Sequence, residues 1–101
     1  MGRMNTIGKT ATKIRTVGPL TIVRYHETNV VAFNELEICL DSGGYRTRTT
    51  KARMNQAANQ FNLPYEVFQH KGEWFVKIAG KTVDFRDGMT FARNQVYASR
   101  G

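Results

Sequence analysis

The chain has 101 residues and a mass of 11.5 kDa, which corresponds to one small domain. Hydrophobic residues make up 41% and charged residues 23% of it, so we expect a globular fold rather than a disordered chain. No apolar run approaches the roughly 18 residues of a membrane-spanning helix, and no apolar block at the N-terminus predicts a secretory signal. The single cysteine, Cys39, excludes an internal disulfide and a zinc site of several cysteines. These features together predict a soluble, intracellular protein.

The charges are segregated along the sequence. Fifteen Lys and Arg residues against eight Asp and Glu residues give a formal net charge of +7, which favours polyanionic partners, nucleic acid before anionic membrane. Every acidic residue lies within residues 27–41 or 66–87. Residues 1–18, 42–65 and 88–101 carry basic residues and no acid. The segregation predicts a surface that faces phosphates. The alternative is a basic surface that only faces water.

Three parts are expected along the chain. We expect residues 1–18 to form an extended basic N-terminal arm, residues 19–90 a single α+β domain, and residues 91–101 a weakly patterned C-terminal tail. The β-branched and aromatic residues of 20–25 predict a strand. Residues 29–40 predict a hairpin that turns at Asn34-Glu35. This register places six residues on one face, namely Asn29, Val31, Phe33, Leu36, Ile38 and Leu40.

A helix is predicted from residue 49 to residue 61. Thr49 or Thr50 can cap its N-terminus with a hydroxyl group. A buried stripe at helical spacing follows, formed by Met54, Ala57, Ala58 and Phe61. Asn62 tolerates a left-handed conformation and Pro64 cannot continue a helix, so the helix is expected to end there.

Residues 65–86 predict a three-stranded antiparallel meander. Lys71-Gly72 and Ala79-Gly80 suit two-residue hairpin turns. The resulting register places one face towards the core, namely Tyr65, Val67, Trp74, Val76, Ile78, Val83 and Phe85. The predicted fold class is therefore α+β, with antiparallel sheets and one central helix in the order strand, hairpin, helix, meander.

The segment of residues 40–56 is the strongest candidate for a phosphate-binding site. A Gly-Gly turn leads into a helix N-terminus, whose free N–H groups and dipole favour anions. The predicted phosphate-binding residues of this segment are Arg46, Arg48, Thr49, Thr50, Lys51, Arg53 and Asn55, with Lys13 and Arg15 of the arm as reinforcement. The spacing of a Walker loop is absent. The alternative is a capped helix whose cations face water.

Two further surfaces could contact nucleic acid. The polar residues Asn55, Gln56, Asn59 and Gln60 are of types that read adenine edges, although ordinary solvent-facing residues are the simpler interpretation. Phe68 and Phe75 should lie opposite each other on the outer face of the meander and could stack on unpaired bases. A homo-oligomer interface, or burial under the N-terminal arm, is the commoner reason for such a pair.

Catalytic chemistry is not predicted. The reactive residues His26, His70, Cys39 and Asp41 form no known constellation by their spacing. Asp84 and Asp87 are a weak pair for a metal-dependent nuclease. We therefore expect no enzyme, no cofactor and no metal site.

Four segments resemble a family of small uncharacterised proteins of tailed bacteriophages. They are residues 25–31 (YHETNVV), 40–56 (LDSGGYRTRTTKARMNQ), 72–76 (GEWFV) and 85–89 (FRDGM), and the resemblance spans about residues 22–90. It implies a phage-encoded protein that acts in the cytoplasm of an infected bacterium. The family carries no established activity, so no residue role is transferred.

Two functions from different classes remain open from the sequence. The first is a small, non-enzymatic protein that binds DNA or RNA through its phosphates. The second is an interaction protein that inhibits a host protein or sequesters a phosphorylated nucleotide, with Tyr45 or another aromatic residue against the base. No membrane partner is expected in either case.

Overall fold

The computed structural model describes residues 11–93, so the predicted arm and tail lie partly outside the described residues. The elements follow in the order β1 (Thr12–Val17), β2 (Leu20–Tyr25), β3 (Thr28–Phe33), β4 (Glu37–Leu40), α1 (Arg48–Phe61), β5 (Tyr65–His70), β6 (Glu73–Ile78), β7 (Lys81–Asp84) and β8 (Met89–Ala92). A five-stranded sheet has the order β1-β2-β3-β4-β8, and a three-stranded sheet has the order β5-β6-β7. All pairs are antiparallel. The predicted α+β class and the order of its elements are confirmed.

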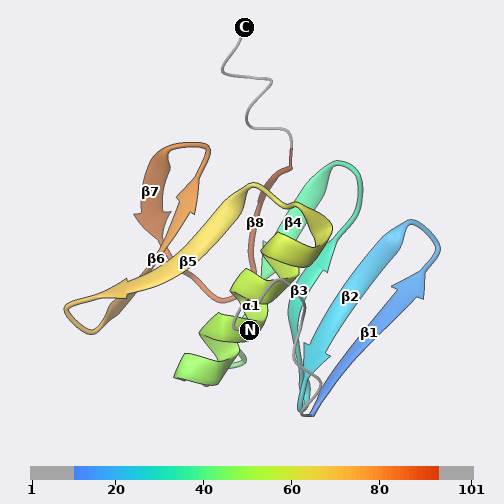
Figure 1. The fold of residues 1–101 in the computed structure, drawn as a ribbon, viewed down its shortest axis with the longest axis horizontal. Coiled ribbons are helices and arrows are strands. Elements are labelled where there is room, and N and C mark those ends of the chain that lie inside the picture. Colours follow the sequence, from blue (N-terminus) through green and yellow to red (C-terminus); the bar gives the residue numbers. More distant parts are fainter. Residues whose placement is uncertain (1–10, 94–101) are drawn as a thin grey trace, which may run out of the picture.

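The helix α1 lies against one side of both sheets (Figure 1), with contacts to β2, β3 and β5. The core between these layers is formed mainly by aliphatic side chains of β2 to β4, the helix face of Met54, Ala57 and Ala58, and the inner face of β5 and β6. Burial of this apolar surface is the main stabilising contribution in a domain of this size.

Both ends of the described chain belong to the five-stranded sheet. Residues 12–17, predicted as part of an extended arm, instead form β1, which pairs with β2 from Thr12↔Tyr25 to Val17↔Leu20. Residues 91 and 92 of the predicted tail end β8, which pairs with β4. Five of the six β1 residues are exposed, so this edge strand lacks the alternation of apolar residues that identifies a half-buried strand.

The hairpin of β3 and β4 has the predicted faces but a different register. Phe33 pairs with Ile38 and Val31 with Leu40, because the connection is longer than the predicted turn. The side-chain carbonyl of Asn34 accepts hydrogen bonds from the N–H groups of Leu36 and Glu37, each at 2.8 Å. The two-residue shift preserves which side chains face inward. It leaves Leu36 in the loop, 68% exposed rather than in the core.

The helix begins one residue earlier than predicted, and its cap is Thr47 instead of Thr49 or Thr50. The Thr47 hydroxyl accepts a hydrogen bond from the N–H of Thr50 at 3.2 Å. Asn62 ends the helix in the left-handed conformation with φ of 56°, as its residue type predicts.

The meander of β5, β6 and β7 is confirmed in full register. Both predicted turns have two residues of positive φ, Lys71-Gly72 and Ala79-Gly80, and Phe68 pairs with Phe75. Val83 is the exception to the predicted core face, since its side chain is 39% exposed on the edge strand β7. Its partner Val76 on the central strand is fully buried.

Tyr65 joins the meander to the helix. Its hydroxyl donates a hydrogen bond of 2.6 Å to the backbone carbonyl of Met54. Burial raises the pKa of the Tyr65 hydroxyl well above its usual range.

Because the unfolded chain titrates Tyr65 near pH 10, its stabilising contribution is complete below about pH 10 and is lost as the pH rises further. We expect the free energy of unfolding to fall by up to about 1.4 kcal/mol per pH unit more in the wild type than in Tyr65→Phe. Denaturant titrations that follow Trp74 fluorescence between pH 8 and 11 measure this difference. Parallel pH profiles of the two proteins would contradict it.

Candidate functional site

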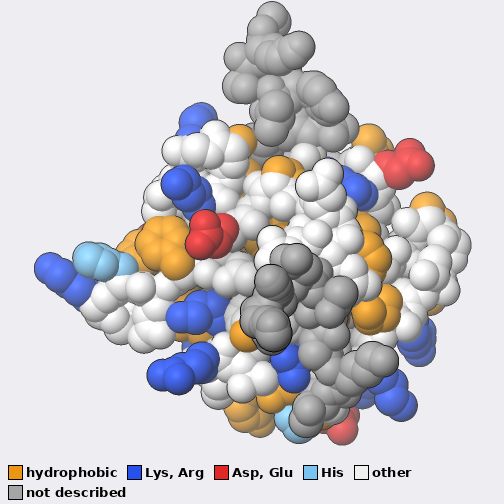
Figure 2. Space-filling model, viewed as in Figure 1, with side chains coloured by type: hydrophobic (Ala, Val, Ile, Leu, Met, Phe, Trp, Pro, Cys, Tyr) orange, Lys and Arg blue, Asp and Glu red, His pale blue; other side chains and the backbone are white. Residues whose placement is uncertain are grey.

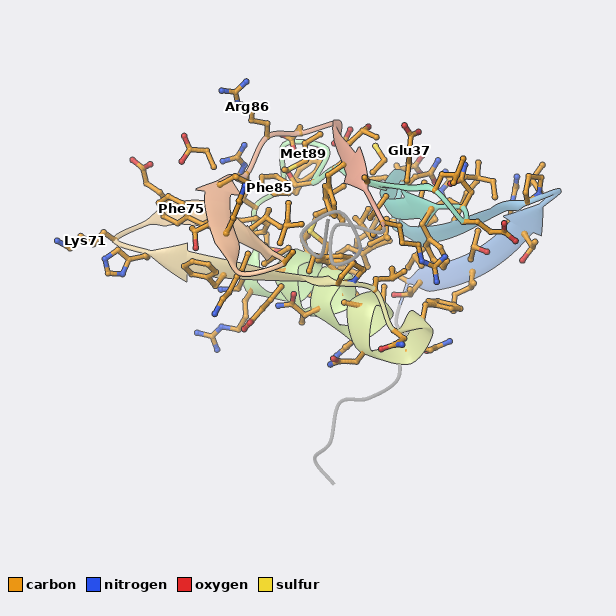
Figure 3. All side chains as sticks on the ribbon, turned by 90° about the horizontal axis from the view of Figure 1, so that it is seen from above. Glu37, Lys71, Phe75, Phe85, Arg86 and Met89 are labelled. Carbon is orange, nitrogen blue, oxygen red and sulfur yellow. The ribbon has the colours of Figure 1, made fainter. Side chains whose placement is uncertain are left out.

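The loop that precedes the helix is held by Asp87, which lies just before β8. One oxygen of Asp87, Oδ1, accepts hydrogen bonds from the N–H of Ser42 at 2.7 Å and from its hydroxyl at 2.6 Å. The other, Oδ2, lies 3.8 Å from Nη2 of Arg46. The Arg46 guanidinium also lies 5.0 Å from the ring centroid of Phe85, the core residue labelled in Figure 3. Arg46 is therefore partly engaged in holding the loop.

Three of the backbone donors at the predicted phosphate site are already used within the chain. The N–H of Gly43 donates to Oδ1 of Asp41 at 2.7 Å, and that of Gly44 donates to the hydroxyl of Ser42 at 3.2 Å. Thr47 caps the N–H of Thr50. The Gly-Gly turn is thus held by hydrogen bonds within the loop, and the Thr50 N–H at the helix N-terminus is capped.

Gly43 is required by this loop for two reasons. Its φ is +65°, and a Cβ there would collide with the side chain of Thr28 on β3. We expect Gly43→Ala to lower the free energy of unfolding by about 2 kcal/mol.

Gly44→Ala is the matched control, because Gly44 also has a positive φ but has nothing within 4 Å of its Cβ position. A loss of about 1 kcal/mol is expected there from backbone strain alone. Chemical denaturation of both variants measures the difference, and equal losses would show that contact with Thr28 does not matter.

Three of the predicted helix residues support the fold. The Arg53 residue is only 9% exposed. Its guanidinium donates to Oγ1 of Thr12 at 2.9 Å and lies 5.5 Å from the ring centroid of Tyr25. Asn55 is bound to Val67 of β5, donating to its carbonyl and accepting from its N–H, each at 2.8 Å. Thr50 is buried and bonds to Thr47. Their polar groups face the protein interior, because helix α1 packs against both sheets.

The remaining predicted residues of this segment face solvent. Arg48 and Thr49 are exposed and Lys51 is half-buried at the first turn of the helix. Among the described residues, only Arg24 and Arg46 take part in ion pairs. The positive charges of Arg48 and Lys51 are therefore unneutralised within the described part of the chain.

Lys13 and Arg15 meet a third cation, Arg24, on the five-stranded sheet. Together with Ile22 and Asn29 they line a groove of about 240 Å³. Lys13 pairs directly with Arg24 across β1 and β2, and Arg15 pairs with Ile22. Thr12 bonds to the helix residue Arg53, so the alternation of side chains along β1 places Lys13 and Arg15 on the opposite face, away from the helix.

Like charges directly opposite each other on neighbouring strands are destabilising. Glu27 offsets Arg24 only weakly, because its side chain is 95% exposed and lies 3.4 Å from the guanidinium. Sequence reasoning missed Arg24, which becomes part of the cluster only once the strand pairing of β1 is known.

A second hollow lies where the β2–β3 turn approaches the helix N-terminus. It has a volume of about 420 Å³, and it is lined by Tyr25, His26, Glu27, Thr28, Val30, Ser42, Tyr45, Thr47 and Thr50. This hollow, with Tyr25 and Tyr45, is the aromatic pocket, and the groove with Lys13, Arg15 and Arg24 is the basic groove. A third hollow, of about 530 Å³, shares Lys13 and Arg24 with the basic groove and His26 and Glu27 with the aromatic pocket. The third hollow therefore connects the basic groove to the aromatic pocket.

Figure 2 shows the helix side of the molecule, where Lys and Arg side chains are spread over the surface and Asp and Glu side chains are fewer. The basic groove lies on the other face of the five-stranded sheet, which this view does not show. Lys71 lies at the tip of the β5–β6 hairpin and Arg86 projects away from the helix (Figure 3), and neither of these two cations lines the groove.

The other candidate residues are dispersed. His26 is in the β2–β3 turn and His70 at the end of β5, while Cys39 is half-buried on β4. Residues 11–93 contain no group of three metal-ligating side chains, and no helix in that range is long and apolar enough to cross a membrane. Phe68 and Phe75 stack with ring centroids 5.7 Å apart and are half-buried. A homo-oligomer interface on this face stays a prediction.

These features define a small α+β protein with a basic groove and an aromatic pocket that a third hollow connects. The chain belongs to the Kyanoviridae Gp96 protein family, whose family model matches residues 3–92. It is therefore a phage protein, which confirms the predicted phage origin, and the match extends towards the N-terminus beyond the expected residues 22–90. No curated protein and no solved structure matches the chain.

Proposed function

We propose that this phage protein binds nucleic acid without catalysing a reaction, and that the basic groove holds the phosphates. The observation that carries the proposal is the convergence of Lys13, Arg15 and Arg24 on one groove. Two of these cations lie directly opposite each other at a cost in stability. A bound phosphate backbone relieves that repulsion and releases the counterions it held.

Arg48 and Lys51 extend the proposed contact surface past the aromatic pocket. Each follows a residue that lines that pocket, Thr47 and Thr50 respectively. A chain of nucleotides that follows the adjoining hollows meets cations at both ends. Arg46 contributes less because Asp87 already partly neutralises it, and Arg53 and Asn55 contribute through the fold alone.

Fluorescence anisotropy tests the proposal directly. Labelled single-stranded DNA, duplex DNA and RNA are titrated with the full chain at about 50 and about 200 mM salt. We expect submicromolar binding of one form that persists at the higher salt. Weak binding to every form that vanishes at the higher salt would contradict the proposal. It would show that the net charge of +7 causes only nonspecific attraction.

The alternative function, sequestration of a phosphorylated nucleotide, is favoured by a different observation. The aromatic pocket, at about 420 Å³, falls within the usual range for small-ligand sites. A free nucleotide that saturates the protein while long strands bind no better than the mononucleotide would favour this alternative. Inhibition of a host protein is supported by no feature of the described residues.

A further inference from the structure

We infer that the aromatic pocket receives the base of an unpaired nucleotide, so that the protein selects single strands or free nucleotides over duplexes. This inference rests on the proposed function, because the base belongs to the nucleic acid that the protein is proposed to bind. It concerns residues other than those of the basic groove. The pocket is bounded by the β2–β3 turn on one side and by the loop and first turn of α1 on the other.

Three hydroxyl groups of the pocket lining, those of Ser42, Thr47 and Thr50, are already hydrogen-bonded within the chain, which argues against a phosphate as the occupant. The hydroxyl of Ser42 donates to Asp87, and the hydroxyls of Thr47 and Thr50 lie 3.0 Å apart in a mutual hydrogen bond. Glu27 adds a negative charge to the lining. What the pocket offers is mostly apolar surface and aromatic rings, so its occupant is a flat, uncharged group.

Two tyrosines supply the stacking surfaces. Tyr25 is held by the guanidinium of Arg53, 5.5 Å from its ring centroid, and by the ring of His26, whose centroid lies 4.3 Å away. Tyr45 is 70% exposed, and its ring contacts no other aromatic ring or cation among the described residues. Its backbone is fixed by hydrogen bonds with Ser42 and Thr47. Tyr45 thus presents a positioned but unpartnered ring at the pocket.

A nucleobase matches this chemistry. Every base has an aromatic face, and stacking on a side-chain ring contributes about 1–3 kcal/mol for each base. The attached phosphates would remain outside, near the cations of the basic groove or of the helix N-terminus. A base paired in a duplex is stacked between its neighbours and would have to be extracted at a cost of a few kcal/mol.

The test compares Tyr45→Ala with Leu36→Ala. Both side chains are highly exposed, at 70% and 68%, so neither change removes core packing, and Leu36 lies in the β3–β4 loop away from the pocket. Each protein is titrated with a single-stranded oligonucleotide, its duplex, an abasic strand of equal length and a nucleoside monophosphate. Trp74 fluorescence on denaturation verifies that both variants are folded.

We expect Tyr45→Ala to bind the single strand about 10-fold or more weakly, with an unchanged salt slope and unchanged binding of the abasic strand. Leu36→Ala should bind every probe as the wild type does. If the monophosphate binds in a Tyr45-dependent way while no strand binds better, the inference holds and the proposed nucleic-acid function fails. If strands bind the wild type and Tyr45→Ala equally well, the inference is wrong and the proposed function stands.

Discussion

Simultaneous replacement of Lys13, Arg15 and Arg24 by glutamine is expected to weaken nucleic-acid binding about 100-fold at 0.1 M salt. On a single strand each phosphate contact contributes a slope of about 0.7 in the dependence of log affinity on log salt. Removing three contacts therefore lowers the slope by about 2, and each unit corresponds to tenfold in affinity at 0.1 M salt. Anisotropy titrations across a salt series measure both quantities.

The matched control removes the same charge elsewhere. Lys71, Lys81 and Arg86 are exposed and take part in no ion pair within residues 11–93. Figure 3 places Lys71 at a hairpin tip and Arg86 just after β7, and none of the three control cations lines the basic groove. Their triple glutamine variant has the same net charge as the groove variant and should weaken binding only a few-fold through the general field. Equal losses in the two variants would show that total charge, and not the basic groove, determines affinity.

Relief of repulsion within the groove gives this experiment a second readout. Because Lys13 and Arg24 face each other across β1 and β2, the groove variant should be no less stable than the wild type. A large loss of stability would mean that the three side chains support the fold, and the affinity change could then not be assigned to phosphate contacts.

Replacement of Asp87 by alanine is expected to lower the free energy of unfolding by about 3 kcal/mol. It removes two charge-assisted hydrogen bonds to Ser42 and leaves the buried donors of that residue unsatisfied. For a domain of this size the loss corresponds to a decrease in melting temperature of roughly 15 °C. Thermal and chemical denaturation monitored by Trp74 measure it.

The variant Asp87→Asn tests how much the hydrogen bonds of Asp87 contribute to stability without its negative charge. The amide oxygen can still accept from Ser42, while the ion pair with Arg46, at 3.8 Å and partly exposed, is lost. We expect a decrease of about 1 kcal/mol. If the alanine and asparagine variants lose equal stability, the charge of Asp87 matters and the acceptor geometry does not.

The local elements followed from local chemistry. The alternation of residues 65–86 and the turn residues at Lys71-Gly72 and Ala79-Gly80 predicted the meander with its register, because backbone conformation and side-chain period act over a few residues. The helix stripe and its end at Asn62 were predicted for the same reason. The N-cap was predicted two or three residues too late, because three closely spaced threonines, Thr47, Thr49 and Thr50, can each serve as a cap.

The site depended on pairing between distant segments. The sequence predicted that the cations of residues 46–53 form one phosphate-binding cluster. In the structure they have different surroundings, because one face of α1 packs against the sheets and the loop before it is held by Asp87. Arg53 is turned inward towards Thr12 and Tyr25, and Arg46 is partly neutralised by Asp87. The basic groove and the aromatic pocket join residues from β1, the β2–β3 turn and the loop before α1.

The sequence by itself determined the α+β class, the helix, the meander and the excess of positive charge, since each depends on residue type and short-range periodicity. Only the tertiary structure decided that residues 12–17 are a strand. It alone also revealed that Lys13 faces Arg24 and that the Gly-Gly loop is closed by Asp87. These contacts join residues far apart in the chain, and their geometry is set by core packing, on which the local pattern carries no information.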